Sequence, residues 1–441
     1  MAATAMSHVR LPDEAGSAAA AAAQSVPAGT ALRAEAGGAE MHHDEVLGEE
    51  VPPELELSVR GIIMQLVARD RGVEPTASQA MGEFPGAQPV SLMRDDVRRA
   101  LCDPAQDYRV SWKADGTRYL LLLLHGGAYL LNRAARVRRV QLRFPGPECE
   151  GGKAHKPLRT LDYTLLDGEM VVDTLPGEPG RQVRRFLAYD LCSYRRDSPD
   201  PATGQLTQLL CGCAWRERVA VLADKVVRPK RLYEEASGPG RYRADAEPFR
   251  VRVKDFYPLA RAEWVLSKWM PTLTHQSDGL VFQSGSAPYV GHTDERLFKW
   301  KFPEMNTVDF LVLRDPNDTA GRPLLCVADS SGGLKDLASV TLPPDVATDA
   351  RGVRPTTAEF RTDDGEPGEV LYEEQVAEFR WDAQTGQWSF LRVRRDKHHP
   401  NHESVFIKVW RSIRDGITVP ELLSMLPRPD SPHPAERDAP V

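Results

Sequence analysis

The stretch Ser111-Trp112-Lys113-Ala114-Asp115-Gly116-Thr117-Arg118 decides how this chain is organised. Strand-like runs lie on both sides of it, Tyr108 to Trp112 before and Tyr119 to Leu124 after. The Asp-Gly pair between them predicts a turn, because glycine tolerates positive φ and lets a ligand approach the backbone closely. We expect a hairpin, with its return strand at Ala128 to Asn132, that presents Lys113 at the edge of the turn. Arg118 would then lie near Lys113, as a phosphate-binding cation lies beside a nucleophile. A solvated lysine at a hairpin is the alternative that this stretch alone leaves open.

Composition and charge exclude several classes of protein. The 441 residues are 41% hydrophobic and 27% charged, which is typical of a soluble globular protein with two domains and a tail. No apolar run approaches the ~18 residues of a membrane span, and we expect no membrane partner. Residues 1–60 hold three arginines and ten acids, so the whole net charge of −7 lies there. This acidic tail argues against a basic arm for nucleic acid.

The cysteines exclude two further kinds of structure. The six cysteines form no CxxC pair and have no regular spacing. They predict neither a disulfide framework nor a zinc site, and they favour a reducing compartment.

The order of predicted elements indicates an α+β fold. Short strands joined by hairpins, with few helices between them, favour antiparallel sheets. The Ala-, Gly- and Glu-rich start predicts disorder, with order beginning near Phe84. Within the predicted tail, Ser58 to Asp70 could form a short amphipathic helix. From Thr307 onward, ~90 residues of short strands suit a small closed barrel such as the OB-fold. The patterns predict helices at Trp215 to Val227, Ala260 to Trp269 and Val405 to Arg414. The expected division is a disordered tail, a sheet domain, a barrel, a helical segment and a disordered end: 1–80, 81–305, 306–404, 405–427 and 428–441.

The run Leu297 to Phe302 carries two lysines on one face. A strand has a period of two, so Lys299 and Lys301 point to one side and the aromatic residues between them to the other. Two adjacent ammonium groups favour an anion between them, for which phosphate is the obvious choice. They would also depress the pKa of a nearby nucleophilic lysine from its usual ~10.4. An ordinary amphipathic edge strand is the alternative.

Two carboxylates and one aromatic residue are further candidates. Glu169 and Asp278 each stand beside a glycine in a strand-like run. Such carboxylates hold Mg²⁺ against a polyphosphate or bind ribose hydroxyls, although turn residues show the same pattern. Tyr189 is either a surface on which a base stacks or a core residue.

A basic cluster stands late in the chain. Its cations surround a single carboxylate, Asp396, and are Arg392, Arg394, Arg395 and Lys397. Such a cluster either lies on a solvated face or clamps a strongly anionic group.

Six motifs occur in a fixed order. They are Lys-Ala-Asp-Gly-Thr-Arg, Thr-Leu-Leu-Asp-Gly-Glu, Phe-Leu-Ala-Tyr-Asp, Ser-Asp-Gly-Leu-Val-Phe, Lys-Trp-Lys and Arg-x-Arg-x-Asp-Lys. In this order they resemble the covalent nucleotidyltransferase superfamily, and most closely the mRNA-capping guanylyltransferases of metazoan type, over about residues 84–425. Phe84 to Ser91, Asn306 to Phe310 and Asp396 to Asn401 also look like that family rather than like DNA ligases.

The resemblance implies a reaction and a set of roles. Lys113 would attack the α-phosphorus of GTP, release pyrophosphate and form a lysyl-N-GMP that passes to the 5′-diphosphate end of RNA. Mg²⁺ or Mn²⁺ would be bound by Asp278 and Glu169. The other GTP-binding positions of the first domain would be Arg118, Arg133, Asp167, Gly168, Glu169, Tyr189, Lys254, Lys299, Trp300 and Lys301. Of these, Tyr189 would stack on guanine. Those of the second domain would be Arg392, Arg394, Arg395, Asp396 and Lys397. Of these, Arg392, Arg394 and Lys397 would meet the β- and γ-phosphates, and Asp396 would orient them.

The resemblance also implies partners and motion. Capping enzymes of this type usually carry an RNA 5′-triphosphatase with a Cys-x5-Arg loop, and no cysteine here has arginine six positions later. We therefore expect a separate triphosphatase, or a chain that is part of a larger enzyme. A nuclear location and docking on the phosphorylated C-terminal tail of RNA polymerase II are implied. Because the second domain's cations must close over GTP and then withdraw, we expect a hinge near residues 303–309.

Two alternatives stay open from the sequence. An ATP-dependent polynucleotide ligase shares the superfamily and differs in the nucleotide that labels it. An inactive RNA- or polymerase-binding scaffold would keep the fold and form no nucleotide adduct.

Overall fold

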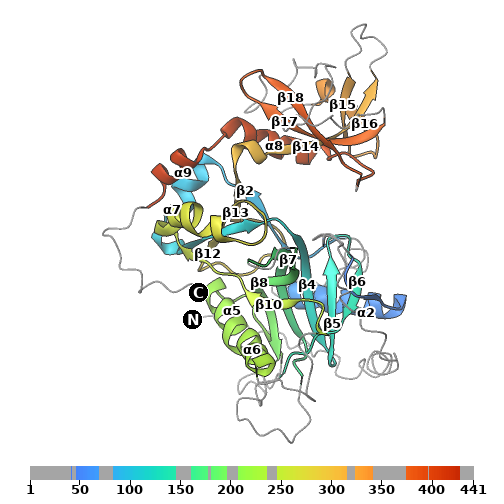
Figure 1. The fold of residues 1–441 in the computed structure, drawn as a ribbon, viewed down its shortest axis with the longest axis vertical. Helices are drawn as coiled ribbons and strands as arrows, with labels where there is room; N and C mark the ends of the chain where they lie inside the picture. The colour runs from blue at the N-terminus through green and yellow to red at the C-terminus, as the bar shows by residue number, and fades with distance from the viewer. Residues whose placement is uncertain are drawn as a thin grey trace, which may run out of the picture.

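The computed structural model describes residue 41 and residues 46–68, 83–145, 160–176, 180–195, 207–235, 246–314, 323–340, 374–395 and 397–427. Most of the predicted N-terminal tail, the predicted disordered end and Asp396 lie outside these residues. The described chain forms three β-sheets with helices on their faces (Figure 1), which confirms the α+β class.

The first sheet has its most buried strand near its middle. Its strands run in the order β1-β6-β5-β4-β7-β8-β10, with β9 beside β8. Their bounds are β1 Glu49–Glu50, β4 Thr117–Leu124, β5 Gly127–Asn132, β6 Val137–Val140, β7 Thr164–Thr174, β8 Gln182–Arg195, β9 Thr207–Leu209 and β10 Arg250–Val253. The leucines of β4 divide between two cores, because alternate side chains point to opposite faces. Both faces of this sheet are therefore covered.

Helices cover each face of the first sheet. On one face lies a continuous run of α5 (Trp215–Val221), η5 (Leu222–Val227) and α6 (Arg228–Glu235). This confirms the predicted helix and extends it. On the other face lies α2 (Pro53–Ala68).

Helix α2 corrects the predicted disordered tail of residues 1–80. Val59 and Ile63 are fully buried and pack with the β4 leucines that face them. Apolar residues four apart form the stripe that a helix buries against a sheet. The Ala- and Gly-rich composition that predicted disorder belongs to the residues before this helix.

The second sheet packs against the first through another core. Its order is β11-β3-β12-β13-β2, with bounds β2 Ala87–Ser91, β3 Tyr108–Ala114, β11 Tyr257–Pro258, β12 Ser277–Ser284 and β13 His292–Lys301. Short helical turns surround it: α4 Arg94–Asp96, η2 Val97–Leu101, η3 Pro104–Gln106, η7 Leu259–Arg261, α7 Ala262–Trp264, η8 Val265–Trp269 and η9 Met270–Thr272. The consecutive elements η7, α7 and η8 confirm the helix predicted at Ala260 to Trp269.

The sheets are mixed rather than purely antiparallel as expected. Strand β10 runs parallel to β8, and β2 runs parallel to β13. A parallel pair needs a long crossover, which the helical run after β9 supplies for β10.

The third sheet has its own core. Its order is β16-β15-β14-β17-β18, with bounds β14 Thr307–Arg314, β15 Pro323–Ala328, β16 Leu334–Asp336, β17 Gln375–Asp382 and β18 Gln387–Val393. With η11 (Leu337–Ser339) and α8 (Glu403–Asp415) it encloses an apolar cluster whose residues all lie between Val308 and Trp410. Figure 1 shows this part at one end of the molecule, away from the first sheet. Helix α8 confirms the one predicted from Val405.

Two connections join the third sheet to the rest. The chain enters it through η10 (Pro303–Met305) and leaves it at Gly416, which ends α8 with φ 51°. Helix α9 (Val419–Met425) then returns to the second sheet, where Leu422 is fully buried. No helix in the described ranges is long and apolar enough to cross a membrane.

Candidate active site

The nucleophile stretch crosses from one sheet to the other. Strand β4 pairs antiparallel with β5, which confirms the return strand expected at Ala128 to Asn132, and it also pairs with β7. Strand β3 pairs with β12 instead, so Asp115-Gly116 is not the turn of a hairpin between β3 and β4. Gly116 has no positive φ. A Cβ there would lie 2.3 Å from the carbonyl oxygen of Met170 and 3.0 Å from Cγ of Glu169. Glycine is needed because the two backbones nearly touch, and this contact places Lys113 at the seam between the sheets.

Lys113 is held by a carboxylate from the neighbouring strand. Its Nζ donates to both carboxylate oxygens of Asp278, at 2.8 and 2.9 Å, and Nζ of Lys301 lies 2.8 Å from the same group. Gly279, next to Asp278, is aligned with Lys113 on one side and Lys301 on the other. Burial acts to raise the pKa of Asp278, but the two ammonium groups outweigh it and hold that pKa below its usual value.

A cavity open to solvent, with about 820 Å³ of empty space, lies beside this cluster. Seven of the predicted residues line it: Lys113, Arg118, Arg133, Asp167, Glu169, Tyr189 and Lys254. Gly168 packs against Phe186 on the opposite face of β7. Tyr189 is the extra residue of a β-bulge, since its neighbours in β8 pair with Gly168 and Asp167. A bulge interrupts the alternation of side chains along a strand, and bulges often redirect a side chain beside a functional site. Strict alternation along β8 would therefore not predict that Tyr189 lines the cavity.

The wall of the cavity contains a buried ion pair. Arg118 Nε donates to Asp167 at 2.9 Å, its Nη1 donates to the carbonyl of Ala87, and both charged side chains are at most 4% exposed. The Tyr289 hydroxyl donates to Asp167 at 2.6 Å and accepts from the backbone N–H of Ala87 at 3.0 Å. Arg118 therefore ties the segment at Ala87 to the motif at Asp167. Its predicted ribose or phosphate contact stays a prediction.

Three groups around the cavity titrate near neutrality. Burial raises the pKa of Glu169 to about 7, against the opposing charges of arginines and Lys113. Burial also lowers the pKa of Lys254 to about 7 and, together with the charge of Lys113, that of Lys299 to about 8. Nζ of Lys254 donates to Ser111 Oγ at 2.7 Å. Proton exchange at these positions is therefore accessible at physiological pH.

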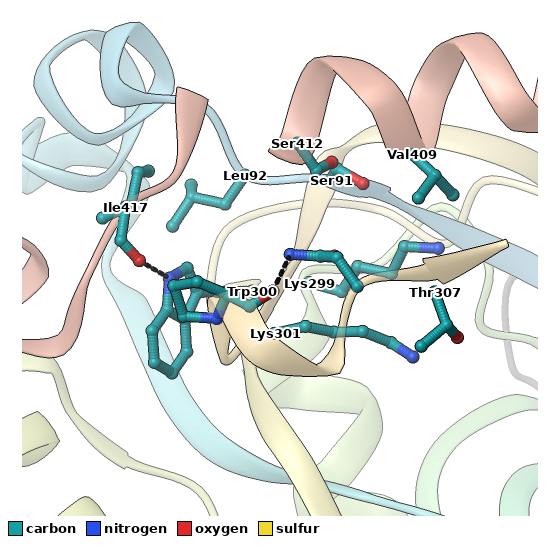
Figure 2. A pocket seen from close by; sticks show the side chains of 11 residues that line it. Ser91, Leu92, Lys299, Trp300, Lys301, Thr307, Val409, Ser412 and Ile417 are labelled. Atoms are coloured by element: carbon teal, nitrogen blue, oxygen red, sulfur yellow. Dashed lines mark hydrogen bonds between the residues drawn. The ribbon is translucent and has the colours of Figure 1, made fainter. Parts of the chain in front are cut away.

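In the Lys-Trp-Lys strand, the two lysines and Trp300 lie on opposite faces, as a period of two predicts. The burial of Trp300 corrects its assignment as a site residue. Trp300 is 4% exposed, packs in the core and donates its indole N–H to the carbonyl of Ile417 at 2.9 Å (Figure 2). Trp300 was expected among the GTP-binding residues, but its side chain anchors the return of the chain toward α9 instead. In Figure 2 the Lys299 and Lys301 side chains lie by Thr307 and Val409, in a junction cavity of about 640 Å³.

The basic cluster of the second domain is paired with acids. Arg394 Nη1 lies 3.0 Å from Asp309, Arg392 Nε donates to Glu378 at 2.7 Å, and Nζ of Lys397 donates to Asp309. Arg395 is exposed. Over the described residues, neither cavity is lined by any of these four cations. The structure therefore assembles the first-domain candidates and leaves the second-domain cations apart from them.

The family model for the mRNA capping enzyme catalytic domain matches residues 41–303, and that for the capping enzyme C-terminal domain matches residues 305–423. The chain belongs to the mRNA-capping enzyme family.

Curated relatives in this capping family span most of the chain. The mRNA-capping enzyme subunit alpha of Neurospora crassa is 30% identical over 412 residues, covering 86% of this chain and 90% of the relative. The same subunit of Saccharomyces cerevisiae is 30% identical and covers 77% of each. The mRNA-capping enzyme of Danio rerio is 30% identical and covers 78% of this chain, which spans 50% of that relative.

Solved structures similar to this capping-family chain include DNA ligases. A mycobacterial DNA ligase D complexed with ATP and MES is 17% identical, with a TM-score of 0.35, covering 71% of this chain and 96% of that one. The ATP-dependent ligase of bacteriophage T7 is 13% identical, with a TM-score of 0.29, covering 70% and 98%.

Several polar residues of this capping-family site escaped the sequence analysis. Arg218 is 1% exposed and forks onto Asp190, at 2.7 and 2.8 Å, behind Tyr189. Asp190 closes the Phe-Leu-Ala-Tyr-Asp motif and so had a local signal. Arg218 and Tyr289 had none, because only the folded chain brings them to Asp190 and Asp167.

Proposed function

We propose that this chain is an mRNA guanylyltransferase that works through Lys113. The amine nitrogen forms a bond to the α-phosphorus of GTP, the bond from that phosphorus to the β-phosphate oxygen breaks, and pyrophosphate leaves. The lysine nitrogen loses two of its three protons to solvent as the P–N bond forms, and keeps one. A terminal phosphate oxygen of a 5′-diphosphate RNA then attacks the same phosphorus, the P–N bond breaks, and the nitrogen takes its protons back from solvent. One observation carries the proposal. In a chain of the capping family, Lys113 lines a cavity and is held by the carboxylate of Asp278, which also binds Lys301 on the next strand.

The contact between Lys113 and Asp278 suits a nucleophile that is held until it is needed. The two hydrogen bonds from Nζ to the Asp278 carboxylate fix where the lysine nitrogen lies. A divalent cation bound by Asp278 would compete with this contact and so free the nitrogen for attack. Lys299 and Lys301, on the same face of β13, then supply positive charge for the α-phosphate.

A divalent metal fits the donor set. Asp278 and Glu169 offer carboxylate oxygens, the ligands that Mg²⁺ and Mn²⁺ prefer, and the phosphates and water would complete the shell. No group of three or more candidate ligand side chains gathers in the described parts of the chain, so the nucleotide is needed to complete the site. The metal would neutralise charge on the phosphates.

The remaining roles form part of the same proposal. Tyr189 would stack on guanine, and Arg392, Arg394 and Lys397 would meet the β- and γ-phosphates. We propose that the third sheet belongs to an OB-fold barrel, on the support of five antiparallel strands around one core with α8 against it. A nuclear location, a separate RNA 5′-triphosphatase and the phosphorylated tail of RNA polymerase II are the proposed surroundings, and they rest on the family resemblance.

Incubation with α-³²P-GTP and Mg²⁺ tests the proposal. We expect an acid-labile, alkali-stable GMP adduct on the wild-type chain that transfers to 5′-diphosphate RNA, and none on Lys113→Ala. Lys335→Ala is the matched control, since its ammonium pairs with Glu403 on the second domain. An adduct that survives Lys113→Ala, or labelling by α-³²P-ATP in place of GTP, would refute the proposal.

A further inference from the structure

Asp309 is a buried carboxylate to which the catalytic scheme above assigns no role. It is 5% exposed and lies on β14, the central strand of the third sheet, just after the first connection between the domains. The residues next to it, Val308 and Phe310, are fully buried in the core on the opposite face of the strand. A carboxylate so far removed from water must be paired, because an isolated buried charge is very costly.

The strand register places acids and bases in one row. Asp309 is aligned with Glu378 on β17, and Glu378 is aligned with Arg392 on β18. Directly paired residues point to the same face of a sheet, and like charges directly opposite one another are destabilising. Arg394 relieves this repulsion, because its Nη1 lies 3.0 Å from Asp309 and 3.8 Å from Glu378.

The segment that carries the basic cluster both begins and ends on Asp309. At its start, Arg394 and Lys397 donate to the two carboxylate oxygens. At its end, the side-chain oxygen of Asn401 accepts from the Asp309 backbone N–H at 2.9 Å, and the Asn401 N–H donates to the Asp309 carbonyl at 2.8 Å. Asn401 is fixed further, since its carbonyl accepts from Ala328 at 3.0 Å. Every polar group of Asp309 is thus used to hold this one segment.

We propose that Asp309 is the positioning residue that orients Arg394 and Lys397 for the pyrophosphate end of GTP. The inference rests on the proposed function, because it needs those two cations to bind the β- and γ-phosphates. A long lysine or arginine side chain samples many rotamers when free, and a fixed carboxylate removes that cost before the nucleotide arrives. Asp309 itself does not contact the substrate.

The proposal makes a prediction that separates the two half-reactions. Pyrophosphate leaves only in the first, so Asp309→Asn should slow formation of the GMP adduct about tenfold or more, as loss of one oriented charge contact does. Transfer from preformed enzyme–GMP to RNA should stay within about twofold. Glu403→Gln is the matched control, because it breaks an ion pair of similar length, 2.9 Å to Lys335, elsewhere on the same domain. It should leave both steps unchanged.

A mutant cycle shows whether Asp309 acts through the cations. Once Arg394→Gln and Lys397→Gln are present, adding Asp309→Asn should slow adduct formation no further. An added loss of the same size, equal slowing of both half-reactions, or no slowing at all in Asp309→Asn would overturn the inference. If wild type forms no adduct, the proposed function has failed instead.

A second variant covers the case in which Asp309→Asn does not fold. Glu378→Gln removes the more distant acid from Arg394 and the partner of Arg392. It should slow the first half-reaction alone, by a smaller factor of about three. A first half-reaction of wild-type rate in that variant would count against the positioning role.

Discussion

Replacing Asp167 by Asn should cost this protein much of its stability. The change keeps the shape of the side chain and removes its charge, which leaves the guanidinium of Arg118 in the wall of the cavity without its hydrogen-bonded anion. Both side chains are at most 4% exposed, so solvent cannot take over. Breaking such a buried pair from one side costs about 3–5 kcal/mol. Arg118 keeps its contact with the Ala87 carbonyl and lies 5.3 Å from the ring centre of Phe84, which places the expected loss at the lower end, about 3 kcal/mol.

An exposed pair of the same chemistry supplies the control. Arg99 and Asp95 form a 3.1 Å ion pair whose side chains are 79% and 65% exposed. Asp95→Asn should therefore change stability by no more than about 0.5 kcal/mol. Urea denaturation followed by tryptophan fluorescence measures both variants in the full chain.

A second substitution separates the pair from its parts. Arg118→Gln with Asp167→Asn should destabilise by less than the sum of the single changes, because each single variant strands one charge and the double variant strands none. A loss below about 1 kcal/mol in Asp167→Asn, or strict additivity, would refute the reasoning about this pair.

Three further outcomes follow from the same structure. Burial raises the pKa of Glu169 to about 7, so its folded state holds a proton more tightly than the unfolded chain. The stability that comes from protonated Glu169 is complete below the unfolded pKa, near 4.5, and is lost as pH rises through 7. Glu169→Gln should therefore flatten the dependence of Tm on pH between these two values. Gly279→Ala should destabilise by about 2 kcal/mol or more, because a Cβ would lie 2.0 Å from the Trp300 carbonyl, whereas Gly61→Ala in open space on α2 should stabilise by about 0.5–1 kcal/mol in the same melts. Trp300→Phe removes the donor to Ile417, and a loss of about 1 kcal/mol should raise amide exchange in α9 about fivefold with exchange in α8 unchanged.

Local pattern predicted what depends on neighbours along the chain. The alternation of Lys299, Trp300 and Lys301 fixes which side chains share a face, because a strand has a period of two wherever it lies. The same holds for the helices that begin at Trp215 and near Val405, whose apolar residues repeat at helical spacing. The ordered motifs identified the family, which the comparison with capping enzymes confirmed.

Burial and pairing were beyond the reach of local pattern. The helix α2 lies in a stretch predicted to be disordered, and it is ordered because the β4 leucines bury its apolar stripe. The hairpin expected at Asp115-Gly116 is instead a crossing between sheets, because β12 competes successfully for β3. The apolar stripe of α2 is visible in the sequence, but its burial, like the pairing of β3, depends on the surface that distant strands offer.

The sequence by itself determined which residue types stand at the site and on which face of each strand they lie. Only the tertiary structure decided their partners: Asp278 on Lys113, Tyr289 on Asp167, Arg218 on Asp190 and Asp309 under Arg394 and Lys397. A buried charge is tolerated only beside a counter-charge, because an unpaired one is costly. That cost does not determine which of the many acids or bases becomes the partner. That choice is made when the sheets close on one another and bring particular carboxylates within reach of each cation.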